Sequence, residues 1–332
     1  GLGGANILVS TMMGGVSASN LADAAMLSRM MVPEMEQKGY SRGFAAAITA
    51  SGSLITPIIP PGIALILYGL VADVSIGSMF MAGILPGLLC SAMLIVTVWL
   101  VAIRRGLKPS SEHWPKPKEV SVALVQAWPA LFLIVAVIGG IRANIFTPTE
   151  AGAVAVLLVM FIGFVIYREL KISHVFTALS ETARSTASVM LIIMASAALG
   201  WIFSLERAGI TVAEFVTSLT DNKYVFLLII NLLLLVLGMF LEGSAILLIL
   251  VPLLKPVVAH FGIDPVHFGI IMILNLSLGT LSPPVGTVML LVCNTVQVSV
   301  GQFMREAVPL LVSLILLLLV ITYIPAISLL LV

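Results

Sequence analysis

Two apolar segments of this chain are interrupted by Pro, Gly and small hydroxyl residues, and these interruptions limit the possible folds more than any other feature. Residues 49–62 read Thr-Ala-Ser-Gly-Ser-Leu-Ile-Thr-Pro-Ile-Ile-Pro-Pro-Gly. A helix could cross a membrane here, but three prolines remove backbone donors and break helical geometry. In hydrocarbon, freed backbone groups cost several kcal/mol unless protein, water or an ion satisfies them. The segment therefore predicts a broken helix with a polar site at the break.

The second segment, residues 275–286, repeats this pattern as Asn-Leu-Ser-Leu-Gly-Thr-Leu-Ser-Pro-Pro-Val-Gly. Two broken helices at corresponding positions of two repeats indicate the binding site of a secondary transporter. The simpler alternative is that Pro and Gly only kink two ordinary spans, as they often do in membranes. At a shift of 224 positions the matched pairs are Ser53 with Ser277, Thr56 with Thr280, Pro60 with Pro284, and Gly62 with Gly286.

The composition is that of an all-α polytopic membrane protein. Apolar residues make up 60% of the chain and charged residues 9%, and several apolar runs approach the ~20 residues that span a bilayer. No basic cluster with interleaved aromatic residues suggests a nucleic-acid partner. The sequence has no Walker A loop, HExxH motif or nucleophile elbow, so we do not expect an enzyme.

Two further segments are expected to form re-entrant hairpins. Residues 3–31 are apolar but interrupted at 14–20, and each arm is too short to cross a bilayer at 1.5 Å per residue. A hairpin that enters and returns on one side fits better. A second hairpin is expected at 224–259, with its tip at Glu242-Gly243-Ser244.

The distribution of Lys and Arg gives the two repeats opposite orientations. Polar connectors at 28–43, 104–118 and 168–184 carry these residues, which mark the cytoplasmic side. The broken helix at 44–70 then runs from inside to outside and the one at 268–293 runs from outside to inside, as in an inverted-topology repeat. Other spans are expected at 79–103, 123–141, 150–167, 185–204 and 303–330, with an external interfacial helix within 206–222.

The domain organisation follows from these assignments. We expect the first repeat at 1–104, a cytoplasmic linker at 105–122, scaffold-type spans at 123–222 and the second repeat at 223–332. Three spans precede the second hairpin and none precedes the first. Symmetry therefore predicts about three helices before residue 1, unless a partner subunit supplies them.

The breaks and hairpin tips suit two kinds of ligand. Unwound carbonyls and hydroxyls suit a hard monovalent cation such as Na⁺, whereas helix N-termini suit an anionic substrate. The alternative for Asp23 is that its carboxylate only stabilises the dipole of its own helix. His260 and His267 are expected to be exposed loop residues rather than a metal-binding pair. The sodium candidates are Ser17, Ser53, Thr56, Gly243, Ser277 and Thr280. The substrate-binding candidates are Ser19, Asn20, Asp23, Ser51, Gly243 and Ser244.

Taken together, these motifs resemble those of a known family. Segments 14–25, 49–69, 74–86, 238–252 and 275–286 are similar to the large membrane (M) subunit of TRAP, or tripartite ATP-independent periplasmic, transporters. The resemblance implies an elevator-type secondary transporter of the bacterial inner membrane, driven by a sodium gradient. It also implies a small membrane (Q) subunit and a periplasmic substrate-binding protein, with sodium sites at the hairpin tips and helix breaks.

We therefore expect a sodium-coupled importer of small organic acids, either carboxylates or sugar acids. One alternative is a stand-alone divalent-anion/sodium symporter of similar architecture. Another is a proton-coupled organic-anion transporter, or a channel-like exporter, that uses Asp23.

Overall fold

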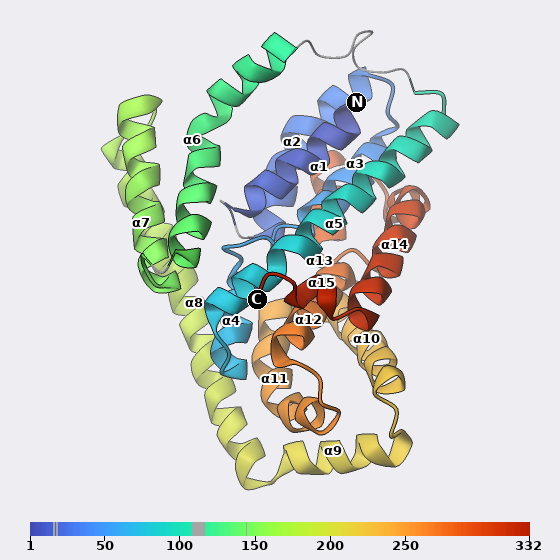
Figure 1. The fold of residues 1–332 in the computed structure, drawn as a ribbon. Coiled ribbons are helices and arrows are strands. Elements are labelled where there is room, and N and C mark those ends of the chain that lie inside the picture. The colour runs from blue at the N-terminus through green and yellow to red at the C-terminus, as the bar shows by residue number, and fades with distance from the viewer. Residues whose placement is uncertain (16, 18, 108–116, 144) are drawn as a thin grey trace. The chain divides into compact units, whose positions relative to one another are not determined.

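The computed structural model describes residues 1–332 except 16, 18, 108–116 and 144 (Figure 1). The described residues contain helices and no strand. Six of these helices are long and apolar enough to cross a membrane. The prediction of an all-α polytopic membrane protein is thus confirmed at this level.

The chain divides into two compact units, which we describe separately. The larger unit comprises Gly1–Ser110 and Leu199–Val332, and the smaller comprises Ser111–Ala198. The larger unit contains both proline-rich breaks and both helix pairs that were expected to be hairpins. All of the candidate site residues therefore lie in the larger unit.

The two ends of the larger unit carry the same succession of helices: a pair, then two short helices separated by a break, then a long helix. In the N-terminal part these are α1 (Leu2–Gly14), α2 (Asn20–Gln37), α3 (Arg42–Ser53), α4 (Ile63–Ala72) and α5 (Ile76–Arg104). In the C-terminal part they are α10 (Lys223–Phe240), α11 (Gly243–His260), α12 (Pro265–Gly279), α13 (Thr287–Val296) and α14 (Val300–Tyr323). Two shorter helices flank the C-terminal part. Helix α9 (Ala208–Leu219) precedes it, within the predicted interfacial segment, and α15 (Ala326–Leu329) follows it.

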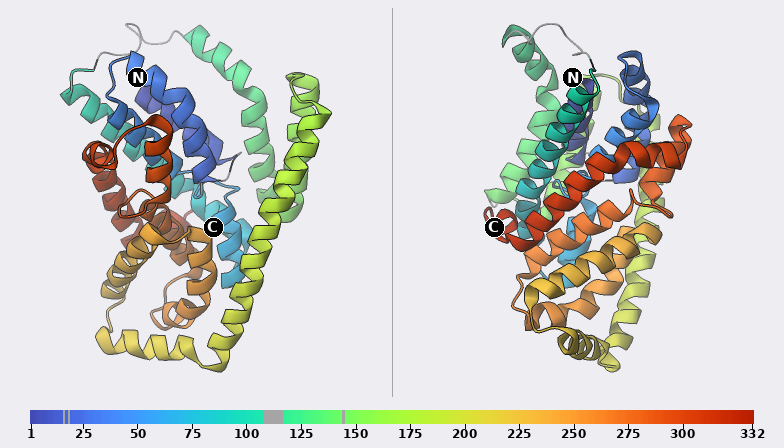
Figure 2. Two further views of the ribbon diagram at one scale, coloured as in Figure 1. Left: turned by 180° about the vertical axis from the view of Figure 1, so that it is seen from behind. Right: turned by 90° about the vertical axis from the view of Figure 1, so that its right-hand side faces the viewer.

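The packing between these two parts is reciprocal. Helix α2 packs against α13, and its counterpart α11 packs against α4, the counterpart of α13. In the same way α14 packs against α3, and α5 packs against α12. The long helices α5 and α14 also contact each other, as the teal and red ribbons show (Figure 2). Each part thus completes the core of the other.

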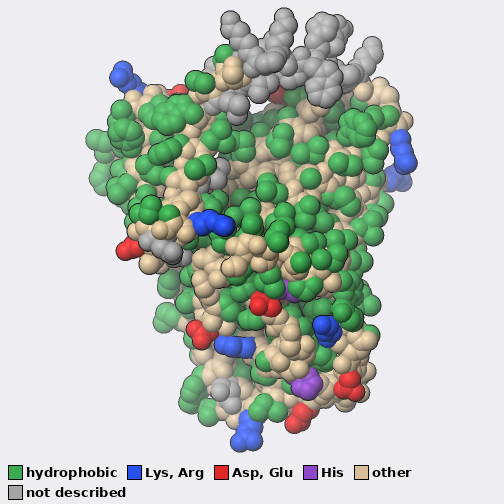
Figure 3. All heavy atoms as spheres, in the orientation of Figure 1, with side chains coloured by type: hydrophobic (Ala, Val, Ile, Leu, Met, Phe, Trp, Pro, Cys, Tyr) green, Lys and Arg blue, Asp and Glu red, His purple; other side chains and the backbone are tan. Residues whose placement is uncertain are grey.

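The smaller unit has little core of its own. It contains α6 (Pro117–Arg142), α7 (Pro148–Phe161) with a π-helical turn at Ile162–Ile166, and most of α8 (Ile172–Leu205). Helices α6 and α7 bury Leu133, Val137 and Ala151 between them. Only 6% of the most apolar stretch of α8 is buried. Hydrophobic side chains dominate the surface on the face drawn in Figure 3, as expected where lipid or another protein covers it.

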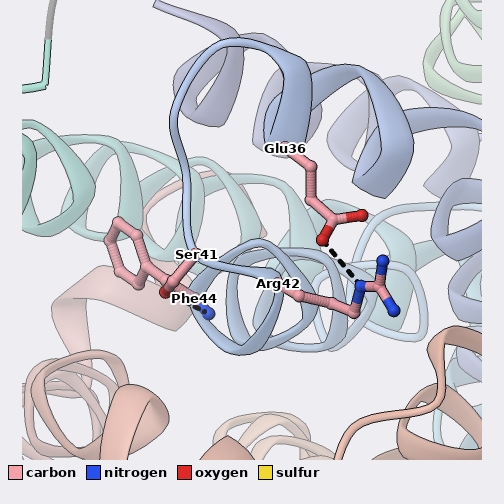
Figure 4. Close-up of polar contacts among 4 residues, drawn as sticks. All are labelled: Glu36, Ser41, Arg42 and Phe44. Carbon is pink, nitrogen blue, oxygen red and sulfur yellow. Dashed lines mark hydrogen bonds and ion pairs between the residues drawn. The ribbon is translucent and has the colours of Figure 1, made fainter.

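The prediction of a polar connector at 28–43 is wrong for most of that segment. Helix α2 continues through Pro33 and ends at Gln37, and the turn after it contains Gly39, whose φ of +87° favours glycine. Only a short turn then leads to α3. There the Ser41 hydroxyl caps α3 by accepting from the Phe44 amide at 3.2 Å, and Arg42 Nε donates to Glu36 Oε1 at 2.6 Å (Figure 4).

The prediction of a connector at 168–184 is also wrong in extent. Helix α8 already begins at Ile172, thirteen residues before the expected start at residue 185. Polar residues in this segment favour a loop, but Leu, Ala, Glu and Arg are good helix formers. No Gly or Pro occurs in this helix before Gly200. The helix therefore extends beyond its apolar part.

Helices α10 and α12 touch through their backbones at two glycines. A Cβ added to Gly279 would lie 2.5 Å from the carbonyl carbon of Gly238, and one added to Gly238 would lie 3.1 Å from the carbonyl oxygen of Leu276. No flexible side chain lies between the two glycines to absorb an added methyl group. This contact fixes the first helix of the pair α10–α11 to the helix that leads into the second break.

We predict that Gly279→Ala destabilises the protein by about 1–3 kcal/mol, because the new methyl group must push α10 and α12 apart. The matched control is Gly301→Ala in α14, where an added Cβ meets nothing within 4 Å. That change should be neutral or stabilising by about 0.5–1 kcal/mol. Thermal unfolding of the two purified variants in detergent tests this. Equal melting temperatures would contradict the close packing of α10 on α12.

Candidate functional site

The first break separates α3 from α4 inside the protein. The amides of Leu54, Ile55 and Thr56 donate to carbonyls three residues back, at 3.0–3.3 Å, so the helix tightens before it ends. The Ile59 amide still donates four residues back, to the Ile55 carbonyl at 3.1 Å, but the prolines at 57, 60 and 61 have no amide to donate and the helix does not continue. Residues 51–60 are all buried. The non-helical backbone is therefore surrounded by protein, as membrane depth requires.

The second break has the same form but is closed by more backbone hydrogen bonds. The carbonyl of Thr280 accepts from the amides of Val288 and Met289, at 3.1 and 3.2 Å. The Gly286 amide donates to the carbonyl of Met239 at 3.1 Å, which ties the break to the end of α10. Both breaks contain a cis Pro-Pro bond, Pro60–Pro61 and Pro283–Pro284.

The residues matched by sequence occupy different backbone positions in the two breaks. Helix α3 ends at Ser53, whereas α12 continues two residues beyond the matching Ser277 to Gly279. Thr56 consequently lies in the non-helical segment, and Thr280 is the C-cap of α12. The pairing of these hydroxyls across the repeats thus holds in sequence but not in local geometry.

Asp23 connects the helix pair α1–α2 to the first break. It lies in the first turn of α2 and is 1% exposed. Its Oδ2 accepts a hydrogen bond from the Thr56 hydroxyl at 3.0 Å. Ser10 of α1 is close enough to interact with the same carboxyl group, but Ser10 Oγ and Asp23 Oδ1 make no direct hydrogen bond in the described part of the chain. A carboxylate oxygen is therefore left in the interior without a direct partner.

Further buried oxygen atoms in this region share that property. Ser51 of α3 is 1% exposed and its hydroxyl has no partner among the described residues. Asn6 donates to the Thr49 hydroxyl at 2.7 Å, but its own Oδ1 accepts nothing there. Buried polar groups are rarely left unpaired without a reason, such as an ion or water that the site holds. The first repeat therefore contains several buried side-chain oxygens that have no protein partner among the described residues.

The chemistry of this set suits a hard cation bound by oxygen. It offers hydroxyl and carboxylate oxygens, which hard cations prefer over nitrogen or sulfur ligands. No group of three or more His, Cys, Asp or Glu side chains that could hold a metal ion occurs among the described residues. The hydroxyl and carboxylate oxygens that are present fit a sodium ion.

In the second repeat the corresponding positions lack the carboxylate, and one buried amide oxygen, Asn275 Oδ1, has no partner among the described residues. Leu247 stands where the shift of 224 would place a partner for Asp23, and it is 2% exposed. Asn275, at the position that matches Ser51 in sequence, donates to Asn231. Asn231 in turn donates to the Thr322 hydroxyl at 3.1 Å. The hydroxyls of Ser277 and Thr280 donate to carbonyls of their own helix turn, as does that of Ser53 in the first repeat.

The tips of the two helix pairs carry the remaining candidates. Ser19 is the N-cap of α2 and accepts from the Ala22 amide at 3.4 Å, and Asn20 is the first residue of that helix. Ser17 lies just before them, and its buried hydroxyl has no partner within the described residues. At the other tip Gly243 begins α11, and the Ser244 hydroxyl donates to Glu242 at 2.9 Å.

Several polar residues of this region were missed by sequence reasoning. Asn6 and Ser10 lie one turn apart on α1 and face Thr49 and Gly52 of α3. Their helical spacing in an apolar segment was the signal that could have found them. In the second repeat Asn231 of α10 and Asn275 of α12 form a similar polar contact between the corresponding helices, although they do not match Asn6 and Ser10 in sequence.

The expectation that His267 is an exposed loop residue is wrong. It lies in α12 and is 1% exposed. Its Nε2 lies 3.2 Å from the carbonyl oxygen of Thr322 in α14. The reason is that Asp264 caps α12 by accepting from the Val266 and His267 amides, so the helix begins before the histidine. His267 therefore joins α12 to α14.

We predict that Thr56→Val lowers the melting temperature, because it leaves both oxygens of the buried Asp23 without a direct donor. Loss of such a bond costs about 1–3 kcal/mol, and more when the group is charged. Thr56→Ser keeps the hydroxyl and should retain most of the stability. The two purified variants are compared by thermal unfolding. A Thr56→Val variant as stable as Thr56→Ser would show that the hydrogen bond contributes little.

Comparison with known proteins gives the family. Residues 1–327 match the protein family described as "Tripartite ATP-independent periplasmic transporter, DctM component". The chain is 40% identical over 332 residues to the sialic acid TRAP transporter large permease SiaM of Vibrio cholerae, covering 99% of this chain and 77% of that protein. It is 35% identical over 325 residues to the 2,3-diketo-L-gulonate large permease YiaN of Escherichia coli, covering 98% and 76%. It is 34% identical over 329 residues to the C4-dicarboxylate large permease DctM of Pseudomonas aeruginosa, covering 99% and 77%. With a family match over nearly its whole length and six helices able to cross a membrane, the chain belongs to the DctM family of TRAP transporter large permeases and is a transport protein of the inner membrane.

Proposed function

We propose that this permease imports small organic acids, either carboxylates or sugar acids, together with sodium ions. The relatives described above are named for sialic acid, 2,3-diketo-L-gulonate and C4-dicarboxylates, and all of these compounds carry a carboxylate. An anion that enters the cell works against the inside-negative potential, at about 2.3 kcal/mol per charge per 100 mV. Co-entry of cations offsets that cost.

The observation that carries the proposal is the environment of Asp23. A buried, ionised carboxylate is costly unless it is paired with a positive charge or fully hydrogen bonded. Asp23 receives one hydrogen bond from Thr56, and its other oxygen has no direct partner in the described residues. A sodium ion beside Asp23 would supply the missing charge.

Sodium candidates in both repeats belong to this proposal. In the first repeat Asp23 and Ser10 add to the ligands expected from the sequence. A bound ion would offset the carboxylate charge and hold α1 and α2 against the break. The sequence-based candidates are Ser17, Ser53 and Thr56 in the first repeat, and Gly243, Ser277 and Thr280 in the second.

The substrate carboxylate is proposed to bind near the N-termini of α2 and α11, whose amides and dipoles favour an anion. Each end already holds one carboxylate. Glu242 caps α11, where it accepts from the Ala245 amide at 3.0 Å. Helix α2 is capped by the uncharged Ser19, but Asp23 lies in its first turn. The further contacts that we propose are Asn20 and Ser51 at the α2 end, and Gly243 and Ser244 at the α11 end.

The same reading includes a movement. Reciprocal contacts such as α2 on α13 and α11 on α4 are those expected of two repeats related by a two-fold axis. In an inverted-topology transporter, re-entrant hairpins and broken helices form the moving part. We propose that here they move together, as in an elevator, against the scaffold spans at 123–222.

Two partners are part of the proposal. A periplasmic substrate-binding protein would deliver the organic acid, and a small membrane (Q) subunit would cover part of the exposed apolar surface of the permease. The isethionate TRAP transporter permease protein DctMQ of Oleidesulfovibrio alaskensis is 36% identical over 312 residues, which are 49% of its own length. Its length beyond the match leaves room for a fused second component.

The decisive experiment is uptake into proteoliposomes that contain the permease with its small membrane partner. A panel of labelled organic acids and cognate binding proteins is tested with an inward sodium gradient, with an inward proton gradient and with neither. Accumulation that needs both sodium and a binding protein supports the proposal. Sodium-dependent uptake without a binding protein favours a stand-alone symporter. Uptake that follows only the proton gradient favours proton coupling through Asp23.

Within that assay we predict that Asp23→Asn raises the half-saturating sodium concentration by at least about tenfold, equivalent to about 1.4 kcal/mol of binding. Ser10→Ala should raise it less, because a neutral ligand is lost. Ser313→Ala is the control, since its hydroxyl donates only to the Leu310 carbonyl within α14. Sodium dependence unchanged in both site variants would contradict the assignment of Asp23.

A further inference from the structure

A cavity lies at one end of the larger unit, away from Asp23 and both breaks. It measures about 210 Å³ and lies between the C-terminal parts of α4 and α11 and the start of α12. Val251, Val258, Ala259 and Phe268 give it mainly apolar walls. The transport proposal makes no use of this cavity.

The rigid part of the cavity is formed by Tyr68. This side chain is 2% exposed, and its hydroxyl donates to the Pro265 carbonyl at 2.6 Å, which joins α4 to α12. The hydroxyl is therefore already committed. The nearby Asp264 is committed too, because it accepts from the first amides of α12. Neither group is the main polar contact for a ligand.

Two opposite charges, Lys255 and Asp73, line the same cavity and both are exposed. In the part of the chain that the structure describes, ion pairs join Arg42 to Glu36 and Arg105 to Glu306, so Lys255 and Asp73 are not paired with each other. Lys255 shares one face of α11 with Val251 and Val258, four residues before and three after it. An ammonium group and a carboxylate therefore stand apart at the rim of an apolar cavity.

This combination has the chemistry of a particular kind of lipid. We propose that the cavity binds a zwitterionic phospholipid with a primary amine, of the phosphatidylethanolamine type. Lys255 binds the phosphate, and Asp73 binds the amine through charge-assisted hydrogen bonds. Asp73 is also the C-cap of α4, where the helix dipole favours a cation. The apolar walls take part of one acyl chain.

The position of the cavity agrees with this ligand. It lies where α4 and the candidate span α11 reach their C-terminal ends, so its charged rim is at the level of lipid headgroups. A phosphatidylglycerol lacks the amine for Asp73. A phosphatidylcholine has a quaternary ammonium group, which carries a positive charge but no N–H donors. Both should bind more weakly than phosphatidylethanolamine.

The test is native mass spectrometry of the purified permease complex in detergent, after addition of each of these three lipids. The expected result is that phosphatidylethanolamine binds about tenfold more tightly than either of the others, a difference that corresponds to one charge-assisted contact. Lys255→Gln and Asp73→Asn should each remove that preference. Ala259→Trp, at an exposed position of the cavity wall, should displace the lipid with both charges in place.

The matched control is Lys223→Gln, which removes an exposed lysine of the larger unit that does not line the cavity. It should bind lipid like the unchanged protein. All variants are checked for unchanged melting temperature before comparison. Equal binding of phosphatidylethanolamine and phosphatidylglycerol would overturn the two-charge site. Competition by free phosphoethanolamine at the same concentration as the lipid would overturn the role of the acyl chain. An effect of Ala259→Trp no larger than that of Lys223→Gln would overturn the cavity as the site.

Discussion

The structure depends on which groups form hydrogen bonds with the backbone amides and carbonyls that have no helical partner, in a chain that is mostly apolar. Each break leaves amides and carbonyls that water cannot reach freely. Both breaks use the same first solution, a tightened last turn in which amides donate three residues back. They differ in the second solution. The second break is closed by hydrogen bonds from Val288, Met289 and Gly286. Among the described residues, the first leaves the buried oxygens Asp23 Oδ1 and Ser51 Oγ without a partner, and the second leaves Asn275 Oδ1.

The two repeats have similar sequences, but the polar groups beside their breaks differ. The repeats share their break motif, their order of helices and their reciprocal packing. They do not share the carboxylate: Asp23 in one repeat is matched by the buried Leu247 in the other. Among the described residues, a buried carboxylate thus lies beside the first break and a leucine takes its place in the second repeat.

Much of the fold could be read from the sequence because Pro, Gly and apolar run length act locally. The breaks, both helix pairs and the long helices α5 and α14 lie close to their predicted positions. The errors at α2 and α8 arose where polar residues continued a helix, since polarity does not by itself end one. The pairing of Asp23 with Thr56 and the burial of His267 depend on contacts between distant segments. No local pattern contains that information.

The two helix pairs contact their breaks through different chemical groups. On one side Gly238 meets Gly279, and the Gly286 amide meets the Met239 carbonyl, so the joint consists of backbone. On the other side Gly14 also packs closely, since a Cβ added to it would lie 3.3 Å from the Cα of Thr56, but the hydrogen bond to the break joins two side chains, Thr56 and Asp23. A backbone hydrogen bond keeps the same strength whatever ions or protons are present. A hydrogen bond to a carboxylate changes with the charge of that group. The attachment of the first helix pair to its break therefore depends on the charge of Asp23, whereas that of the second pair does not depend on any ionisable group named above.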